Sequence, residues 1–448
     1  MIGQFPWDPF PPGEPEPKGP DPIQSLAFRS AVTAADAYRS VRLAVRRESG
    51  TLRLGNRFVA DGRYREVAFL AFGHAANSMG LAALHAIGDR LTQGFLAGPE
   101  PVPPELPFHG VTVTPGWGGD RTAPEVVAAA TDIAGGLSEQ DLLLVLLSPG
   151  STRALALPPP DVSAEEFSAL LRRAHERGAT GREVSQLARV LGTGGVGGRL
   201  GAAVARADVA TLVVDRGDGP TSVGGGPMRP VAATERTQAG ALLERLELAD
   251  GLPPSARASF APGDSEPVTL GTRVGSPVVV ASPADALRAA ADTLFDKGWT
   301  SRLGFLEIRD GPEAGADRFL ARAEELLAAE PLSAESRTKG VAVFAMTTLG
   351  LPEGVDEGPA FGRFLVRAGA RVRRREMSVG LFRTAGAVGA PGFPAGAVVG
   401  APTDPEARVR PGRARAVPMR LGITDVGLLA LALCPAPGAV RPPRRGAG

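Results

Sequence analysis

The sequence predicts an α/β protein with two domains, and three observations lead to this fold class. Short apolar runs alternate with segments of helical spacing, which is typical of parallel β-sheets covered by helices. The chain has 448 residues, whereas a single hydrophobic core rarely grows past about 250–300 residues. Hydrophobic residues make up 43% and charged residues 22% of the chain, so it can bury cores of ordinary size.

In the first half of the chain, strand-like runs are followed by helix-like segments. The run EVAFLAFG at 66–73, for example, leads through a glycine into a helical pattern at 76–91. This rhythm of strand and helix indicates a parallel sheet. The expected strands are 66–73, 109–115, 141–148 and 209–217, and the expected helices are 76–91, 123–137, 163–178 and 181–192.

A second α/β pattern follows a stretch at 249–277 that is rich in Pro, Gly and Ser, lacks periodicity and is the predicted linker. The helix expected at 283–298 has Ser282 as N-cap, Pro283 at its first position and Gly298 as its C-terminal stop. The other segments of this pattern are 277–282, 301–310, 315–330, 340–350 and 427–435. The expected organisation is a disordered Pro-rich lead at 1–22, a first domain at 23–248, the linker, a second domain at 278–434 and a disordered basic tail at 435–448.

Composition excludes several classes of function. The formal net charge is +1, from 49 basic and 48 acidic residues, so nothing favours nucleic acid or an anionic membrane as partner. The single cysteine, Cys434, cannot form a disulfide framework, and the four histidines do not have zinc-ligand spacing. The N-terminus lacks the pattern of a signal peptide, and the apolar runs are shorter than the roughly 20 residues of a membrane helix. We therefore expect a soluble, cytoplasmic protein.

The loop after the expected strand at 141–148 is the first candidate site. Its residues Ser148, Gly150, Ser151 and Thr152 offer backbone N–H groups and hydroxyls, which can bind a phosphate at the start of a helix. The structural alternative is an ordinary βα loop whose Ser and Thr residues cap the helix.

A second candidate is the glycine-rich segment 191–205, which contains a formal GxGxxG pattern. A dinucleotide-binding fingerprint should follow a strand directly, but the preceding residues have helical spacing. The pattern therefore favours a flexible loop before a helix, in which Gly197 and Gly198 could still line an anion site.

Asp215 and Asp218 follow the expected strand at 209–217. Carboxylates at the carboxyl end of a parallel strand can hold Mg²⁺, so both are candidate metal ligands. The structural alternative is an Asp/Gly turn whose side chains accept hydrogen bonds from their own backbone. Sequence reasoning leaves these two alternatives open.

His74 stands in the turn AFGHAANSMG, between an expected strand and an expected helix. This is a usual setting for a residue that contacts a phosphate or carboxylate. An imidazole has an ordinary pKa of about 6.5 and is mostly neutral at pH 7, so His74 could donate a hydrogen bond but would carry little fixed charge.

Taken in order, the loops of the chain resemble those of the class II glycerate kinases, the MOFRL family. FGHAANSMG is similar to the family's Gly-Lys-Ala-Ala…Met turn, and SPGSTRALALP to its Ser-Gly-Gly-Gly-Ser-Ala-Leu…Pro loop. VGGRLG is similar to Lys-Gly-Gly-Arg-Leu, and VVDRGDGPTSVGGGP to Ser-Asp-Val-x-Gly-Asp…Ser-Gly-Pro. FAMTTLG, TAGAVG and GITDVGL resemble the family's last three motifs, so the similarity runs from about residue 24 to residue 434.

The resemblance implies a Rossmann-like N-terminal domain and a smaller α/β C-terminal domain of MOFRL type, with the active site in the cleft between them. It also implies ATP- and Mg-dependent phosphorylation of D-glycerate to 2-phosphoglycerate. In this reading His74 stands at the position of the family's lysine. The residues that would line the substrate cleft are Thr384, Gly386, Gly389 and Thr424.

The chain departs from the family's motifs at several charged positions. Val196 replaces the lysine before Gly-Gly, Met346 replaces a glutamate, and Ala385 and Val388 replace two aspartates. Phosphoryl transfer depends on positioning and on neutralising negative charge, and losing one such contact costs roughly 10²–10³ in rate. These departures predict a weak or inactive pseudokinase with a binding or regulatory role.

Two alternatives remain open. A divergent active kinase would act on glycerate or another small hydroxy acid with ATP and Mg²⁺, and Arg153 or Arg199 would add positive charge. An interaction protein would use the Pro-rich N-terminus instead. The expected partners are a glycerate-like molecule or a nucleotide, and either a second copy of the chain or an active paralogue.

Overall fold

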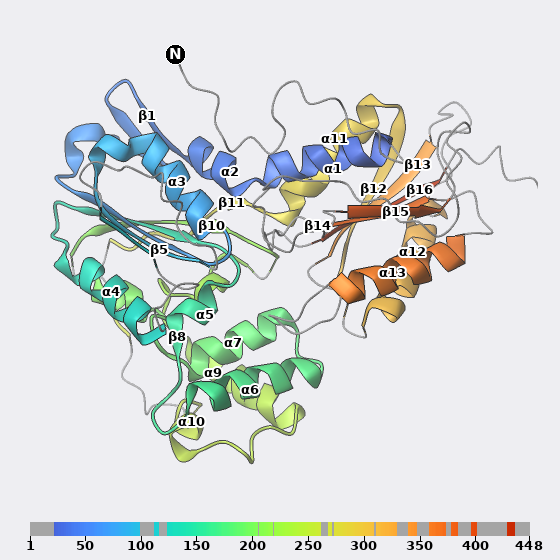
Figure 1. Cartoon of the computed structure of the whole chain (residues 1–448). Helices are drawn as coiled ribbons and strands as arrows, with labels where there is room; N and C mark the ends of the chain where they lie inside the picture. Colours follow the sequence, from blue (N-terminus) through green and yellow to red (C-terminus); the bar gives the residue numbers. More distant parts are fainter. Residues whose placement is uncertain are drawn as a thin grey trace, which may run out of the picture. The chain divides into compact units, whose positions relative to one another are not determined.

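The computed structural model describes residues 22–98, 112–115, 123–204, 206–217, 219–260, 268–270, 273–308, 311–328, 339–346, 358–372, 378–383, 396–400 and 428–434. The chain divides into two compact units (Figure 1). The central unit is Ala37–Ser282, and the terminal unit combines Met1–Asp36 with Pro283–Gly448. In the part of the chain that is described, no helix has the length and hydropathy needed to cross a membrane.

The central unit is built on a six-stranded sheet in which all neighbouring strands are parallel. Its strand order is β11-β10-β7-β4-β5-β6. Counted along the chain this is 6-5-4-1-2-3, the strand order of Rossmann folds, so the expected Rossmann-like sheet is confirmed. The strands are β4 (Val67–Phe72), β5 (Leu91–Ala97), β6 (Thr112–Pro115), β7 (Leu142–Leu147), β10 (Asp208–Val214) and β11 (Val278–Ala281).

Every residue of β4, β7 and β10 is buried, because both faces of the sheet are covered. On one face, Leu70 and Val145 belong to a core that includes side chains of α4, α5 and α8. On the other face, Gly80 of α3 lies against the Phe69 ring, and α3 and α4 lie on opposite sides of the sheet (Figure 1). The helices are α2 (Ala37–Ala44), α3 (Ala76–Ile87), α4 (Ala123–Gly136), α5 (Ser151–Leu155) and α8 (Arg199–Ala203).

A group of helices with its own core extends from the central unit. Phe167, Leu187 and Leu243 lie in this core, which residues of α6, α7, α9 and α10 share. Ser163 and Thr180 begin α6 and α7 with capping boxes, in which each hydroxyl accepts a backbone N–H three residues on. The elements are α6 (Ala164–Glu176), α7 (Gly181–Leu191), α9 (Ala233–Arg245), α10 (Pro254–Ala258), and the short paired strands β8 (Ala156–Leu157) and β9 (Thr193–Gly194).

A small antiparallel sheet that the sequence analysis did not predict precedes β4. Its strands are β1 (Val45–Glu48), β2 (Thr51–Leu54) and β3 (Arg57–Ala60), joined by two-residue turns. Leu52 and Leu54 are buried, and Gly55 packs against Leu212 of β10. The 3-10 turns η1 (Asp61–Arg63), η2 (Gly88–Arg90) and η3 (Val223–Gly225) complete this unit.

The terminal unit has a five-stranded mixed sheet with the order β12-β13-β16-β14-β15. β12 and β13 are parallel and the other pairs are antiparallel, while Phe319, Phe344 and Phe364 meet in the core on one face. This confirms a second, α/β domain. Its elements are α1 (Pro22–Ala35), α11 (Pro283–Asp296), β12 (Trp299–Leu306), α12 (Pro312–Ala328), β13 (Lys339–Met346), α13 (Gly358–Val372), β14 (Ser378–Arg383), β15 (Gly396–Gly400) and β16 (Leu428–Cys434).

The expected domain boundaries need three corrections. Helix α1 belongs to the terminal unit, where Thr293 of α11 donates a hydrogen bond to Ser30 at 2.6 Å. The strand expected to open the second domain is β11, which instead pairs with β10. The expected linker is packed where it is described, because Leu252 and Ala256 lie in the core of the helical group. These segments were expected in the wrong domain because the hydrophobic cores of both domains are built from similar apolar runs.

Candidate functional site

The candidate site lies at the carboxyl ends of β4, β7 and β10, three adjacent strands of the central sheet. The strand order reverses between β4 and β7, because the chain runs outward from β4 in one direction and from β7 in the other. Ligands of open α/β sheets bind at such a switch point. His74 follows β4, Ser148 follows β7 and Asp215 follows β10, so the fold brings the three candidate loops to one edge.

The turns after β4 and β7 are joined directly. The His74 N–H donates to the Pro149 carbonyl at 2.9 Å. The imidazole of His74 lies against Gly150, so close that a Cβ on Gly150 would be 2.6 Å from Nε2. Gly150, the N-cap residue of α5, has a φ of +87°, a conformation that favours glycine. The half-buried His74 therefore packs on the loop that was expected to bind phosphate.

The two serines of this loop hold the loop together. Ser148 is fully buried, and its hydroxyl donates to the Phe72 carbonyl at 3.1 Å and accepts from the Ala75 N–H at 3.0 Å. The buried Ser151 hydroxyl donates to the Ser148 carbonyl at 2.6 Å. Both hydroxyls thus have the structural role that was the alternative to phosphate binding, because they form hydrogen bonds with the backbone of the turns.

Two backbone donors of this loop remain at the start of α5. Within the described backbone, the N–H groups of Gly150 and Thr152 donate to no carbonyl outside this helix. The Thr152 side chain is partly exposed, whereas Arg153 is exposed. The loop can therefore contact an anion through Gly150, Thr152 and Arg153.

Gly197 and Gly198 lie beside the loop after β10, and their N–H groups are engaged within the protein. They donate to the carbonyls of Gly225 and Gly226, each at 2.9 Å. Gly224 in turn lies against Ser151, because an added Cβ would be 2.9 Å from its Oγ. Three loops therefore converge: the one after β7, the one before α8 and the one after β10.

The buried cation beside these loops, Arg189, was missed by sequence reasoning. Its side chain is 2% exposed, and it donates to the carbonyls of Thr221, Arg229 and Pro230 and pairs with Glu235. Burial lowers its pKa to about 10, so the guanidinium stays protonated at neutral pH. A lone arginine in the last turn of a helix normally complements the helix dipole on the surface, so local sequence carried no signal for this role.

Asp215 is buried, and its Oδ1 accepts the N–H groups of Gly217 at 3.0 Å and Gly219 at 3.1 Å. This is the Asp/Gly turn that was expected as the alternative to a metal ligand. The Oδ2 atom of Asp215 receives no hydrogen bond from described residues. Asp218 lies outside the described residues, as do Thr384, Gly386, Gly389 and Thr424. Among the residues that the structure describes, no group of three or more His, Cys, Asp or Glu side chains could hold a metal ion.

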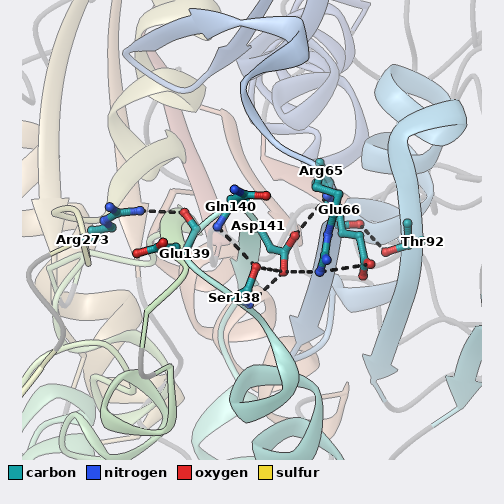
Figure 2. A network of polar contacts seen from close by, with 9 residues as sticks. Arg65, Glu66, Thr92, Ser138, Glu139, Gln140, Asp141 and Arg273 are labelled. Carbon is teal, nitrogen blue, oxygen red and sulfur yellow. Dashed lines mark hydrogen bonds and ion pairs between the residues drawn. The ribbon is translucent and has the colours of Figure 1, made fainter.

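The opposite edge of the sheet also carries buried carboxylates, again missed by sequence reasoning. Asp141 precedes β7 and accepts hydrogen bonds from the Ser138 hydroxyl and N–H and from Arg65 (Figure 2). Burial raises the pKa of Asp141, but these hydrogen bonds outweigh it and hold the pKa below its usual value.

Asp208, at the start of β10, accepts the Tyr64 hydroxyl at 2.8 Å and pairs with Arg63 at 3.2 Å. Because the ligand end of a parallel sheet is its carboxyl edge, we assign both carboxylates a structural role.

The model of one protein family, described as "Domain of unknown function (DUF4147)", matches residues 24–261, which is more than half of the chain. The chain belongs to this family, the class II glycerate kinases. Within it, the chain is 28% identical over 247 residues to a protein of Danio rerio named glycerate kinase, covering 51% of this chain and 48% of the relative. It is 31% identical over 215 residues to the Homo sapiens glycerate kinase, covering 44% and 40%. The chain thus matches about half of the length of these curated relatives.

Two solved structures share the fold of this family member. A glycerate kinase of Thermotoga maritima matches with a TM-score of 0.64 and 20% identity, over 92% of this chain and 98% of that one. A protein of Pyrococcus horikoshii matches with a TM-score of 0.66 and 20% identity, over the same shares. At this identity the likeness shows the fold alone, and it extends over both units.

Proposed function

We propose that this member of the class II glycerate kinase family binds a glycerate-like molecule or a nucleotide at the loops after β4 and β7, and that it is a weak or inactive kinase with a binding or regulatory role. The contact of His74 with Gly150 carries the proposal. It supports a ligand site at the switch point of the sheet that has an imidazole where the resemblance implies a lysine.

The loss of charge is the reason to expect weak catalysis. An imidazole carries less positive charge at neutral pH than the ammonium of a lysine, and it is shorter. Val196, at the second position where the resemblance implies a lysine, is fully buried in the core of the central unit. Phosphoryl transfer without these two cations would lose roughly 10²–10³ in rate for each contact removed, although such losses do not add simply.

The residues present fit parts of a nucleotide site. The N–H groups of Gly150 and Thr152 would hold a phosphate, and Asp215 would offer Oδ2 to Mg²⁺, an ion that one or two carboxylates commonly hold together with phosphate oxygens and water. When bound, the ion would neutralise charge on the phosphates. Asp215 would keep its orientation through the N–H groups of Gly217 and Gly219.

An assay of ADP release with the full-length protein, ATP, Mg²⁺ and D-glycerate tests the catalytic part of the proposal. We expect a turnover below about 0.1 s⁻¹, against about 1–100 s⁻¹ for typical kinases. Thermal unfolding with ATP-Mg²⁺ or glycerate tests the binding part, because a ligand at about 100 times its Kd stabilises the folded state by about 2.7 kcal/mol. If neither ligand shifts the transition, the binding site is refuted and an interaction role through the N-terminal segment is favoured.

A divergent active kinase is the second candidate, and the exposed Arg153, in the loop on which His74 packs, favours it. Turnover clearly above about 0.1 s⁻¹ would establish this alternative. The triple variant His74→Lys, Ala385→Asp and Val388→Asp restores three charged groups of the resembled motifs. If lost charge explains the low rate, this variant gains turnover, whereas a matched His74→Gln variant does not.

A further inference from the structure

The loop Thr221–Pro230, between β10 and α9, has a backbone that few sequences can adopt. Gly224, Gly225 and Gly226 have φ values of 69°, 69° and 60°, so three successive residues are left-handed. Each glycine loses more conformational freedom on folding than any other residue, which makes a loop of this kind costly to order. The loop has hydrogen bonds of its own, such as the one from the Gly225 N–H to the Ser222 carbonyl at 3.0 Å, and contacts from outside the loop add to them.

Arg189 of α7 supplies the outside contact that reaches both ends of the loop. Its Nη1 donates to the Thr221 carbonyl at 3.3 Å, at one end of the loop. Its Nη2 donates to the carbonyls of Arg229 at 2.9 Å and Pro230 at 2.7 Å, at the other end. Nη1 also lies 3.4 Å from Oε1 of Glu235, which compensates the buried charge. One guanidinium thus joins both ends of the loop.

The held loop forms part of the candidate site. Its carbonyls at Gly225 and Gly226 accept the N–H groups of Gly197 and Gly198. Its Gly224 lies against Ser151, the first residue of α5. A change in the ends of the loop would therefore reach the start of the helix whose N–H groups would meet the ligand.

We propose that Arg189 is a positioning residue: it clamps the loop Thr221–Pro230 and so holds Ser151 and the loop after β7, where the proposed function places an anionic ligand. The ligand part of this inference rests on the proposed function, whereas the clamp stands on the contacts alone. Lysine cannot replace the clamp fully, because its single ammonium lacks the planar fork that reaches three carbonyls and a carboxylate together.

Hydrogen exchange of the full-length protein tests the clamp. In Arg189→Met, the N–H groups of Gly197 and Gly198 lose stable acceptors, so we expect their exchange to accelerate by about tenfold or more, with Arg189→Lys in between. Amides of β4 and β7 should keep their rates. Arg177→Met is the matched control, because the Arg177 guanidinium also donates to carbonyls, those of Leu246 at 2.5 Å and Glu247 at 2.8 Å, away from this loop.

Unchanged exchange at Gly197 and Gly198 in folded Arg189→Met, or a change equal to that in Arg177→Met, would overturn the clamp. If Arg189→Met does not fold, Gly226→Ala perturbs the same contact from the loop, since its Cβ would lie 2.7 Å from the Thr221 carbonyl oxygen and 2.9 Å from Nη1 of Arg189, the two atoms that this contact joins. The same local acceleration is expected there, and its absence would again overturn the clamp.

Affinity for ATP-Mg²⁺, measured by calorimetry, tests the positioning role. We expect Kd to rise about tenfold in Arg189→Met, to recover partly in Arg189→Lys and to stay unchanged in Arg177→Met. An unchanged Kd despite accelerated exchange would refute the positioning role and leave Arg189 a purely structural residue. If the wild-type protein binds neither ATP-Mg²⁺ nor glycerate, the proposed function fails, while the exchange measurement still decides whether the clamp exists.

Discussion

Replacing Gly150 by alanine disturbs the contact that defines the candidate site. The left-handed backbone at Gly150, with φ of +87°, costs a residue that has a Cβ about 1–2 kcal/mol. The added methyl would also lie 2.6 Å from Nε2 of His74, and overpacking of this kind costs about 1–3 kcal/mol more. We therefore expect Gly150→Ala to lower the free energy of unfolding by about 2–5 kcal/mol.

A double-mutant cycle with His74→Ala separates the two contributions. Without the imidazole, the same glycine substitution should cost only the backbone strain of about 1–2 kcal/mol, which leaves a coupling of about 1–3 kcal/mol. Gly178→Ala is the matched control, because Gly178 has a φ of +92° and nothing within 4 Å of an added Cβ. Urea unfolding followed by circular dichroism gives each free energy. An equal cost of Gly150→Ala in both backgrounds would refute the packing of His74 on this loop.

Three further predictions concern stability. Ser148→Ala leaves the buried Ala75 N–H without its acceptor, so it should cost about 1–3 kcal/mol in urea unfolding. Ser163→Ala removes the cap of α6 and should cost about 0.5–2 kcal/mol in the same measurement. The lowered folded-state pKa of Asp141 contributes stability above its unfolded-state pKa of about 3.9, which is lost as pH falls through the folded-state pKa. Unfolding free energies between pH 7 and pH 3 should therefore fall more steeply for the wild type than for Asp141→Asn, and equal slopes would contradict this.

Sequence patterns were sufficient to predict those strands and helix ends that depend on a few neighbouring residues. β4 and β7 are uninterrupted apolar runs and β10 is apolar except for Asp208 and Thr211, and both the strands and their parallel pairing follow the prediction. The stop of α11 at Gly298, which has a φ of +78°, was readable because glycine ends helices in this conformation. By contrast, β5 was missed because its sequence LTQGFLA mixes polar residues and a glycine with the apolar ones.

Within the site, sequence reasoning identified loops but not what their side chains do. Ser148 and Ser151 have the composition of a phosphate loop, yet their hydroxyls satisfy backbone groups of the turns. Gly197 and Gly198 have the composition of an anion site, yet their N–H groups pair with another loop. These outcomes depend on which acceptor lies nearest in space, and a sequence does not state distances between separate segments.

The sequence by itself determined that apolar strands alternate with helices, that the chain builds two α/β units, and that glycine-rich loops follow the central strands. These features follow from residue periodicity and turn chemistry, which act over a few neighbouring residues. Only the tertiary structure decided that β4 lies beside β7, that His74 packs on Gly150, and that the cation of Arg189 is buried among the carbonyls of a distant loop. The physical reason is that strand order and burial depend on contacts between segments far apart in the chain, whose free energies no local pattern contains.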